Sequence, residues 1–65
     1  MIEIHYKRSD GAFSYEIRLK KTHQKFHCEG FESLEQCEQD AREMVYAHHG
    51  RERVKEVYEP EIFTT

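Results

Sequence analysis

The dipeptide Asp10-Gly11 stands between two segments, 2–7 and 13–20, in which apolar and polar residues alternate. Alternation with a period of two is typical of strands that bury one face. Asp-Gly tolerates the positive φ angles of a two-residue type I′ turn. The pattern predicts an antiparallel hairpin in which Ser9 faces Ala12. In this register matching side chains face one another, and a slip of one residue would separate them: Tyr6 with Tyr15, Ile4 with Ile17, Ile2 with Leu19, Glu3 with Arg18 and His5 with Glu16.

A third strand is predicted over residues 25–29, reached through a loop that contains no glycine. Pairing Phe26 with Leu19, and Cys28 with Ile17, keeps apolar side chains on one face of the sheet. This register makes the second strand central.

The period then changes to that of a helix, which we expect to run from about Leu34 to His49. Ser33 and Gln36 have the spacing of a capping box at its start, and Gly50 supplies a stop. A short or bulged fourth strand is predicted within residues 53–59.

These elements predict an α+β fold, a small β-β-β-α-β domain in which an antiparallel meander sheet packs one helix on one face. Residues 1–65 form a single domain, since a chain of this length is near the lower size limit for domains. The last strand would return parallel to the first or the third by a right-handed crossover, and its position in the sheet stays open. A thin core, with a mean hydropathy of −0.97, makes self-association as a homodimer an expected outcome.

The longest apolar run, residues 44–47, is too short for a membrane span or a signal peptide. We therefore expect a cytoplasmic protein that has no membrane partner. Two cysteines, Cys28 and Cys37, are too few for a disulfide-stapled domain. Both fall on faces predicted to be buried, so we expect them to be reduced and unreactive.

Charge divides the chain into two unequal halves. Residues 1–28 hold six Lys or Arg and three acids, a charge of +3, whereas residues 29–65 hold four and ten, a charge of −6. The outer face of the helix would therefore steer a partner with a basic surface. The candidate partner-binding residues on this face are Glu35, Glu38, Gln39, Arg42 and Glu43.

Nucleic-acid binding is the alternative function, because basic residues gather around the second hairpin. It is less favoured, since the aromatic side chains needed for stacking face inward and the acidic helix would repel a duplex. The candidate residues for this alternative are Arg18, Lys20, Lys21 and Lys25.

Catalysis, metal binding and cofactor binding are not expected. His5, Glu16 and Glu29 would stand in one row on the exposed sheet face, but Arg18 beside them would repel a cation. No nucleophile elbow or phosphate-binding glycine loop is present in the sequence.

The order of the expected strands, the hairpin segment 10–15 and the helix start at 30–37 together resemble the HicB-type antitoxin domain, a partial RNase H fold that binds a small toxin. The resemblance covers residues 2–49 as a pattern and assigns no residue a role. It implies binding to another protein. An open strand edge and the acidic helix surface also favour binding to a protein. We expect a small non-enzymatic interaction domain, of bacterial or phage type as judged from its size and compactness, that regulates or inhibits a larger protein by direct contact.

Overall fold

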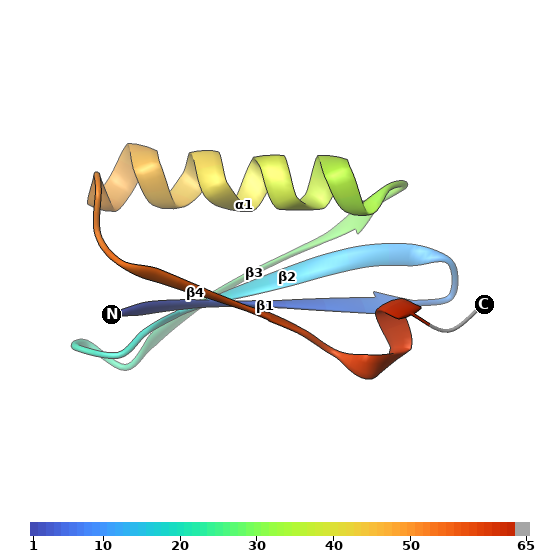
Figure 1. The fold of residues 1–65 in the computed structure, drawn as a ribbon, viewed down its shortest axis with the longest axis horizontal. Coiled ribbons are helices and arrows are strands. Elements are labelled where there is room, and N and C mark those ends of the chain that lie inside the picture. The colour runs from blue at the N-terminus through green and yellow to red at the C-terminus, as the bar shows by residue number, and fades with distance from the viewer. Residues whose placement is uncertain (64–65) are drawn as a thin grey trace.

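The computed structural model describes residues 1–63 as a four-stranded sheet with one helix lying across one face (Figure 1). The strand order is β3-β2-β1-β4. The elements, in chain order, are β1 (Ile2–Ser9), β2 (Ala12–Leu19), β3 (Gln24–Phe31), α1 (Leu34–His49), β4 (Val54–Tyr58) and the 3₁₀ helix η1 (Pro60–Phe63).

The first hairpin has the predicted register over all of its length. Ile2 faces Leu19 at one end and Ser9 faces Ala12 at the other. Asp10 and Gly11 have φ angles of 52° and 78°, so both turn residues have the positive φ that a type I′ turn requires. Because the pairs are matched in size and charge, the side chains themselves select this alignment.

The third strand is longer than predicted, and its predicted register is wrong by two residues. Phe26 faces Ile17 instead of Leu19, and Cys28 faces Tyr15 instead of Ile17. The reason is a tight loop over residues 20–23, which His23 closes with a φ of 59°. Since the error is even, the same side chains still point toward the helix.

A β-bulge interrupts the pairing of β2 and β3 near the end of β3. Phe13 faces Phe31 while Ser14 faces Glu29, so Gly30 is the extra residue, and its φ of 92° suits glycine. The bulge changes the alternation of β3, and Phe31 consequently packs against the buried core.

The helix begins and ends where the sequence predicts. The Ser33 side chain accepts a hydrogen bond from the backbone N–H of Gln36 at 3.2 Å, and Gly50 closes the helix with a φ of 66°. Cys37, Ala41 and Val45, spaced four apart, are the residues of α1 that are buried against the sheet.

The sheet is mixed, so the expectation of an antiparallel meander is correct for β1, β2 and β3 and wrong for the whole sheet, whose last strand runs parallel to β1, one of the two expected positions. α1 returns the chain along the sheet, so β4 enters parallel to β1 with Ile2 facing Val54 and Tyr6 facing Tyr58. The strand is short, as expected. Its alternation places Glu56, a charged residue, on the same face as α1, opposite Ile4.

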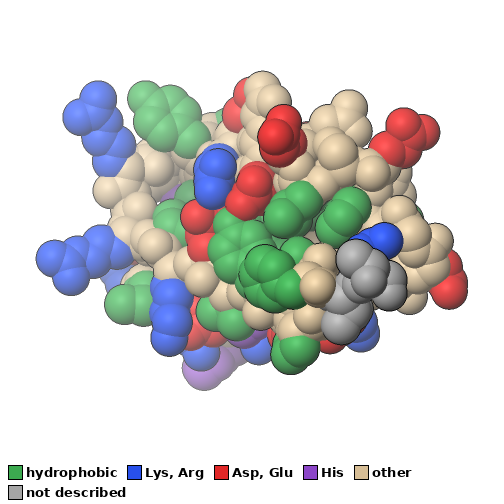
Figure 2. All heavy atoms as spheres, turned by 45° about the vertical axis from the view of Figure 1, so that its right-hand side comes forward, with side chains coloured by type: hydrophobic (Ala, Val, Ile, Leu, Met, Phe, Trp, Pro, Cys, Tyr) green, Lys and Arg blue, Asp and Glu red, His purple; other side chains and the backbone are tan. Residues whose placement is uncertain are grey.

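The core lies between α1 and the sheet, and it includes one residue from η1, Ile62. Ile62 is buried, and residues 64–65 lie outside the described part of the chain. Beside it, the rings of Tyr58 and Phe63 lie 6.2 Å apart. Figure 2 shows apolar side chains gathered on this side of the molecule, with acidic side chains above them.

No helix within residues 1–63 is long and apolar enough to cross a membrane.

Candidate functional site

The single helix is too narrow to cover the sheet. A helix with its side chains is about 10 Å across and strands lie about 4.8 Å apart, so one helix covers about two strands. α1 lies mainly over β2, and β3 projects beyond it as the edge strand. The space between α1 and β3 is consequently open to solvent.

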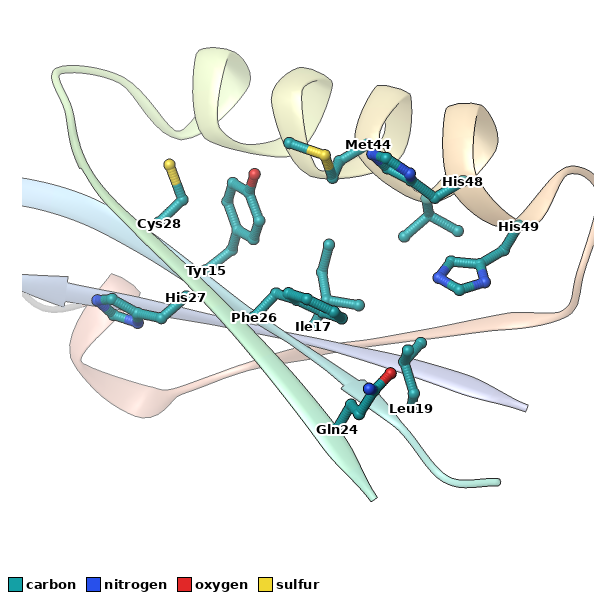
Figure 3. Close-up of a pocket in the computed structure, with 11 residues that line it drawn as sticks. Tyr15, Ile17, Leu19, Gln24, Phe26, His27, Cys28, Met44, His48 and His49 are labelled. Atoms are coloured by element: carbon teal, nitrogen blue, oxygen red, sulfur yellow. The ribbon is translucent and has the colours of Figure 1, made fainter. Parts of the chain in front are cut away.

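This space is an apolar hollow of about 440 Å³. Ile17 and Phe26 lie on its sheet side and Met44 on its helix side (Figure 3). Phe26 is 51% exposed and Met44 is 41% exposed, although both point toward the space between the two layers. His48 and His49, in the last turn of α1, border the hollow at one end.

The other end of the hollow contains Tyr15 and Cys28. The Tyr15 hydroxyl donates a hydrogen bond to Asp40 Oδ2 at 2.6 Å, which ties the central strand to α1. Burial, followed by this carboxylate, raises the pKa of Tyr15 well above its usual value. Tyr15 therefore keeps its proton and serves as a hydrogen-bond donor.

The two cysteines differ in exposure. Cys37 is fully buried, as predicted, and burial raises the pKa of its thiol to about 11. Cys28 was also predicted to be buried, but it is only half-buried because it lies on β3, where α1 no longer covers the sheet. The thiol accessible from the hollow is therefore that of Cys28.

A second hollow, of about 490 Å³, lies between the first half of α1 and the end of β3. It is polar, and Glu32, Asp40 and Glu43 supply three carboxylates to its lining. We call the two hollows together the α1–β3 groove. One half of this groove is apolar and the other half is acidic.

The predicted partner-binding residues do not form one uniform surface. Glu35, Gln39 and Glu43 are exposed, and the Gln39 side-chain amide lies 3.3 Å from Glu43 Oε1. Gln39 and Glu43 also line the acidic half of the groove. The structure therefore places part of the predicted set in the acidic half of the groove.

The other two predicted residues, Glu38 and Arg42, turn toward β4. Arg42 Nε and Nη2 donate to the two oxygens of Glu56 at 2.9 and 3.0 Å. This contact lowers the pKa of Glu56. Glu38 accepts a hydrogen bond from the hydroxyl of Tyr58 and lies 3.6 Å from Arg42. Glu38 and Arg42 thus help to attach α1 to the sheet.

Acidic residues interleave with the predicted basic set. Arg18 Nε lies 2.6 Å from Glu16 and lowers the pKa of that carboxyl. Lys20 Nζ lies 3.4 Å from a carboxylate oxygen of Glu3. The remaining members are exposed: Lys21, 3.9 Å from Glu52, and Lys25 on β3.

The row of possible metal ligands on the exposed sheet face differs from the predicted one. The shifted register places His27, instead of Glu29, opposite Glu16. His5 Nε2 lies 3.0 Å from Glu3 Oε1. Within residues 1–63, no three His, Cys, Asp or Glu side chains converge into a group that could hold a metal ion.

Sequence reasoning missed the α1–β3 groove because it placed Phe26 on a face assumed to be covered. Comparing the width of one helix with four strands would have indicated an uncovered strand. Comparison of the chain with family models, curated proteins and solved structures finds no match.

Proposed function

We propose that this chain is a small non-enzymatic interaction domain that binds a larger protein through the α1–β3 groove and regulates or inhibits that protein by direct contact. The observation that carries the proposal is the exposure of Phe26 and Met44 on facing sides of one hollow. Contiguous exposed apolar side chains with a polar rim are typical of protein-binding surfaces.

An amphipathic helix of the partner is the segment that we propose to fill the groove. Such a helix would lie beside α1 and cover β3, completing the second layer over the sheet. Its apolar side chains would contact Phe26 and Met44, and its basic side chains would lie near Glu32 and Glu43. The opposite charges would raise the association rate.

The chemistry of the groove supports binding better than catalysis. The Tyr15 hydroxyl is held by Asp40 and keeps its proton. The nucleic-acid alternative has weaker support, because Arg18, Lys20 and Lys21 each have a carboxylate within 4 Å.

Two synthetic helical peptides test the proposal. One carries leucine on one face and lysine on the other, and the second carries glutamate in place of lysine. We expect the leucine–lysine peptide to bind at least tenfold more tightly in fluorescence anisotropy, and its advantage to shrink as salt rises. Equal binding of both peptides, or tighter binding of single-stranded DNA than of either peptide, would contradict the proposal.

Matched variants locate the site. Phe26→Ser with Met44→Gln should reduce peptide binding about tenfold or more, since the apolar anchors of the hollow are lost. Tyr46→Ser is the control, because Tyr46 is 64% exposed on α1 but does not line the groove. Circular dichroism should show that all variants fold. Equal losses in the groove variant and the control would place the binding site elsewhere.

The acidic half is tested by Glu32→Lys with Glu43→Lys, two exposed residues that line it. This change should slow association about tenfold at low salt and have less effect at high salt. Charge reversal at Lys20, Lys21 and Lys25 should matter less. The reverse ranking would place the binding site on the basic hairpin.

A further inference from the structure

The outer edge of β3 has no neighbouring strand among the described residues. β3 has eight residues and contains no proline. β4, the edge strand at the other side of the sheet, has only five residues and is soon followed by Pro60. A long, uncovered edge presents backbone N–H and C=O groups that can pair with another strand. β3 is therefore the better edge for strand addition.

The sequence of β3 is complementary to itself when two copies run antiparallel. With His27 of each copy at the symmetry axis, Lys25 of one copy lies opposite Glu29 of the other, and this pair occurs twice. Both side chains are exposed on the sheet face away from α1. On the helix face, Phe26 lies opposite Cys28 of the second copy. Across the interface, opposite charges would therefore face each other on one side of the sheet, and apolar side chains would face each other on the other side.

Neighbouring registers lose this match. A shift of one strand by two residues, which keeps the same side chains on each face, places Lys25 opposite His27 or Phe31 of the second copy, depending on the direction. No Lys–Glu pair forms in either case. Opposite charges that face each other across strands are favourable, and like charges are unfavourable. The charges of β3 thus select one register.

We infer that β3 pairs with β3 of a second copy of this chain, and that the two sheets join into one eight-stranded sheet around a two-fold axis. The inference goes beyond the proposed function, because it concerns the edge of β3 and does not depend on what fills the α1–β3 groove. Both α1 helices lie on the same face of the joined sheet. Phe26 and Cys28, exposed and half-buried in one copy, each gain an apolar neighbour.

A charge swap tests the pairing by sedimentation equilibrium from low to hundreds of micromolar protein. Lys25→Glu alone and Glu29→Lys alone each create two like-charged contacts, so each should weaken dimerisation about tenfold. The double variant restores both contacts with their signs exchanged, and it should dimerise within about twofold of the natural sequence. Lys7→Glu, a reversal on the same sheet face but away from the edge, is the control.

Three results would overturn the inference: a monomer throughout this range, equal effects of Lys25→Glu and Lys7→Glu, or a double variant weaker than both single ones. Peptide binding by the monomer would leave the proposed function intact. Conversely, a dimer that binds neither peptide would reject the proposed function alone.

Cysteine cross-linking tests the register. In a Cys28→Ser background, His27→Cys should form a reducible dimer under mild oxidation, because residues that face each other across strands have Cβ atoms about 5 Å apart. Lys55→Cys on β4 in the same background is the matched control and should stay monomeric. Cross-linking through Lys55→Cys but not through His27→Cys would assign the interface to β4. Efficient cross-linking of the natural Cys28 to itself would reject the proposed register.

Discussion

The guanidinium of Arg42 and the carboxylate of Glu56 form a two-point ion pair that joins α1 to β4, with donor–acceptor distances of 2.9 and 3.0 Å. Glu56 Oε2 also accepts a hydrogen bond of 2.5 Å from the hydroxyl of Tyr6 on β1. One carboxylate therefore connects the helix with both strands of the parallel pair. This connection explains why a charged residue is tolerated on the helix face of β4.

Glu56 should make the free energy of unfolding depend on pH in the acidic range. Its pKa in the folded protein lies below the ordinary value of 4.5 because Arg42 and Tyr6 donate to the carboxylate. A carboxyl whose pKa is lowered by folding stabilises the protein above its unfolded pKa, and this contribution is lost as pH falls through the folded pKa. We expect the free energy of unfolding, measured with urea, to fall as pH drops below about 4.5, and to fall less steeply in Glu56→Gln. The exposed substitution Glu35→Gln should leave the pH profile unchanged, and an unchanged profile in Glu56→Gln would reject this role.

Tyr15 should stabilise the fold through its hydroxyl group as well as through its buried ring. Tyr15→Phe keeps the buried ring but removes the donor to Asp40, and we expect a loss of about 1–2 kcal/mol in the free energy of unfolding. Tyr46→Phe, at an exposed position, should change stability by less than about 0.5 kcal/mol. Equal values for the two variants in denaturant titrations would mean that the Tyr15–Asp40 bond does not contribute in solution.

The two cysteines should react at different rates. Cys28 is half-buried beside an open hollow, whereas Cys37 is fully buried with a thiol pKa raised to about 11. We expect a maleimide reagent to label one site in the native protein and two sites in urea, as counted by mass spectrometry. Cys28→Ser should abolish native labelling. Rapid native labelling of Cys37 would show that α1 separates from the sheet on the timescale of the reaction.

Glycine should be needed at position 11 because the turn requires a positive φ there. Its φ is 78°, and no atom lies within 4 Å of the position that a Cβ would occupy. Gly11→Ala should therefore lower the free energy of unfolding by about 1 kcal/mol through backbone strain alone. Gly11→Asn should lose less, since asparagine tolerates left-handed angles. Equal losses in thermal melts would point to a steric cause instead.

The parts of the fold that could be predicted are those in which the residue types themselves identify which positions pair or where an element ends. The first hairpin is such a case, because Tyr6 and Tyr15, or Glu3 and Arg18, identify each other across a turn with a known signal. The bounds of α1 are another, since Ser33 and Gly50 mark its two ends.

The register of β3 could not be predicted in the same way. The loop before it turns on His23 at a positive φ of 59°. Histidine adopts positive φ more often than most residues do, but it is a far weaker turn signal than glycine, and no glycine in the sequence indicated how short the loop is. The candidate site was missed for a related reason. Alternation shows that Phe26 points toward the helix layer, but only the width and position of α1 determine that the layer does not reach it.

The parallel pairing of β1 with β4 sets the order in which the sheet can be completed. The second neighbour of β1 comes from residues 54–58, so the pairing of β1 is complete only after the chain as far as residue 58 has been synthesised. Contacts between segments so distant in sequence form late, because the intervening chain must first close into a loop. Until then, the edge of β1 is open to other growing chains, in addition to the edge of β3, which β4 does not cover. How quickly α1 brings β4 into place therefore determines how long each new molecule is open to pairing with the wrong neighbour.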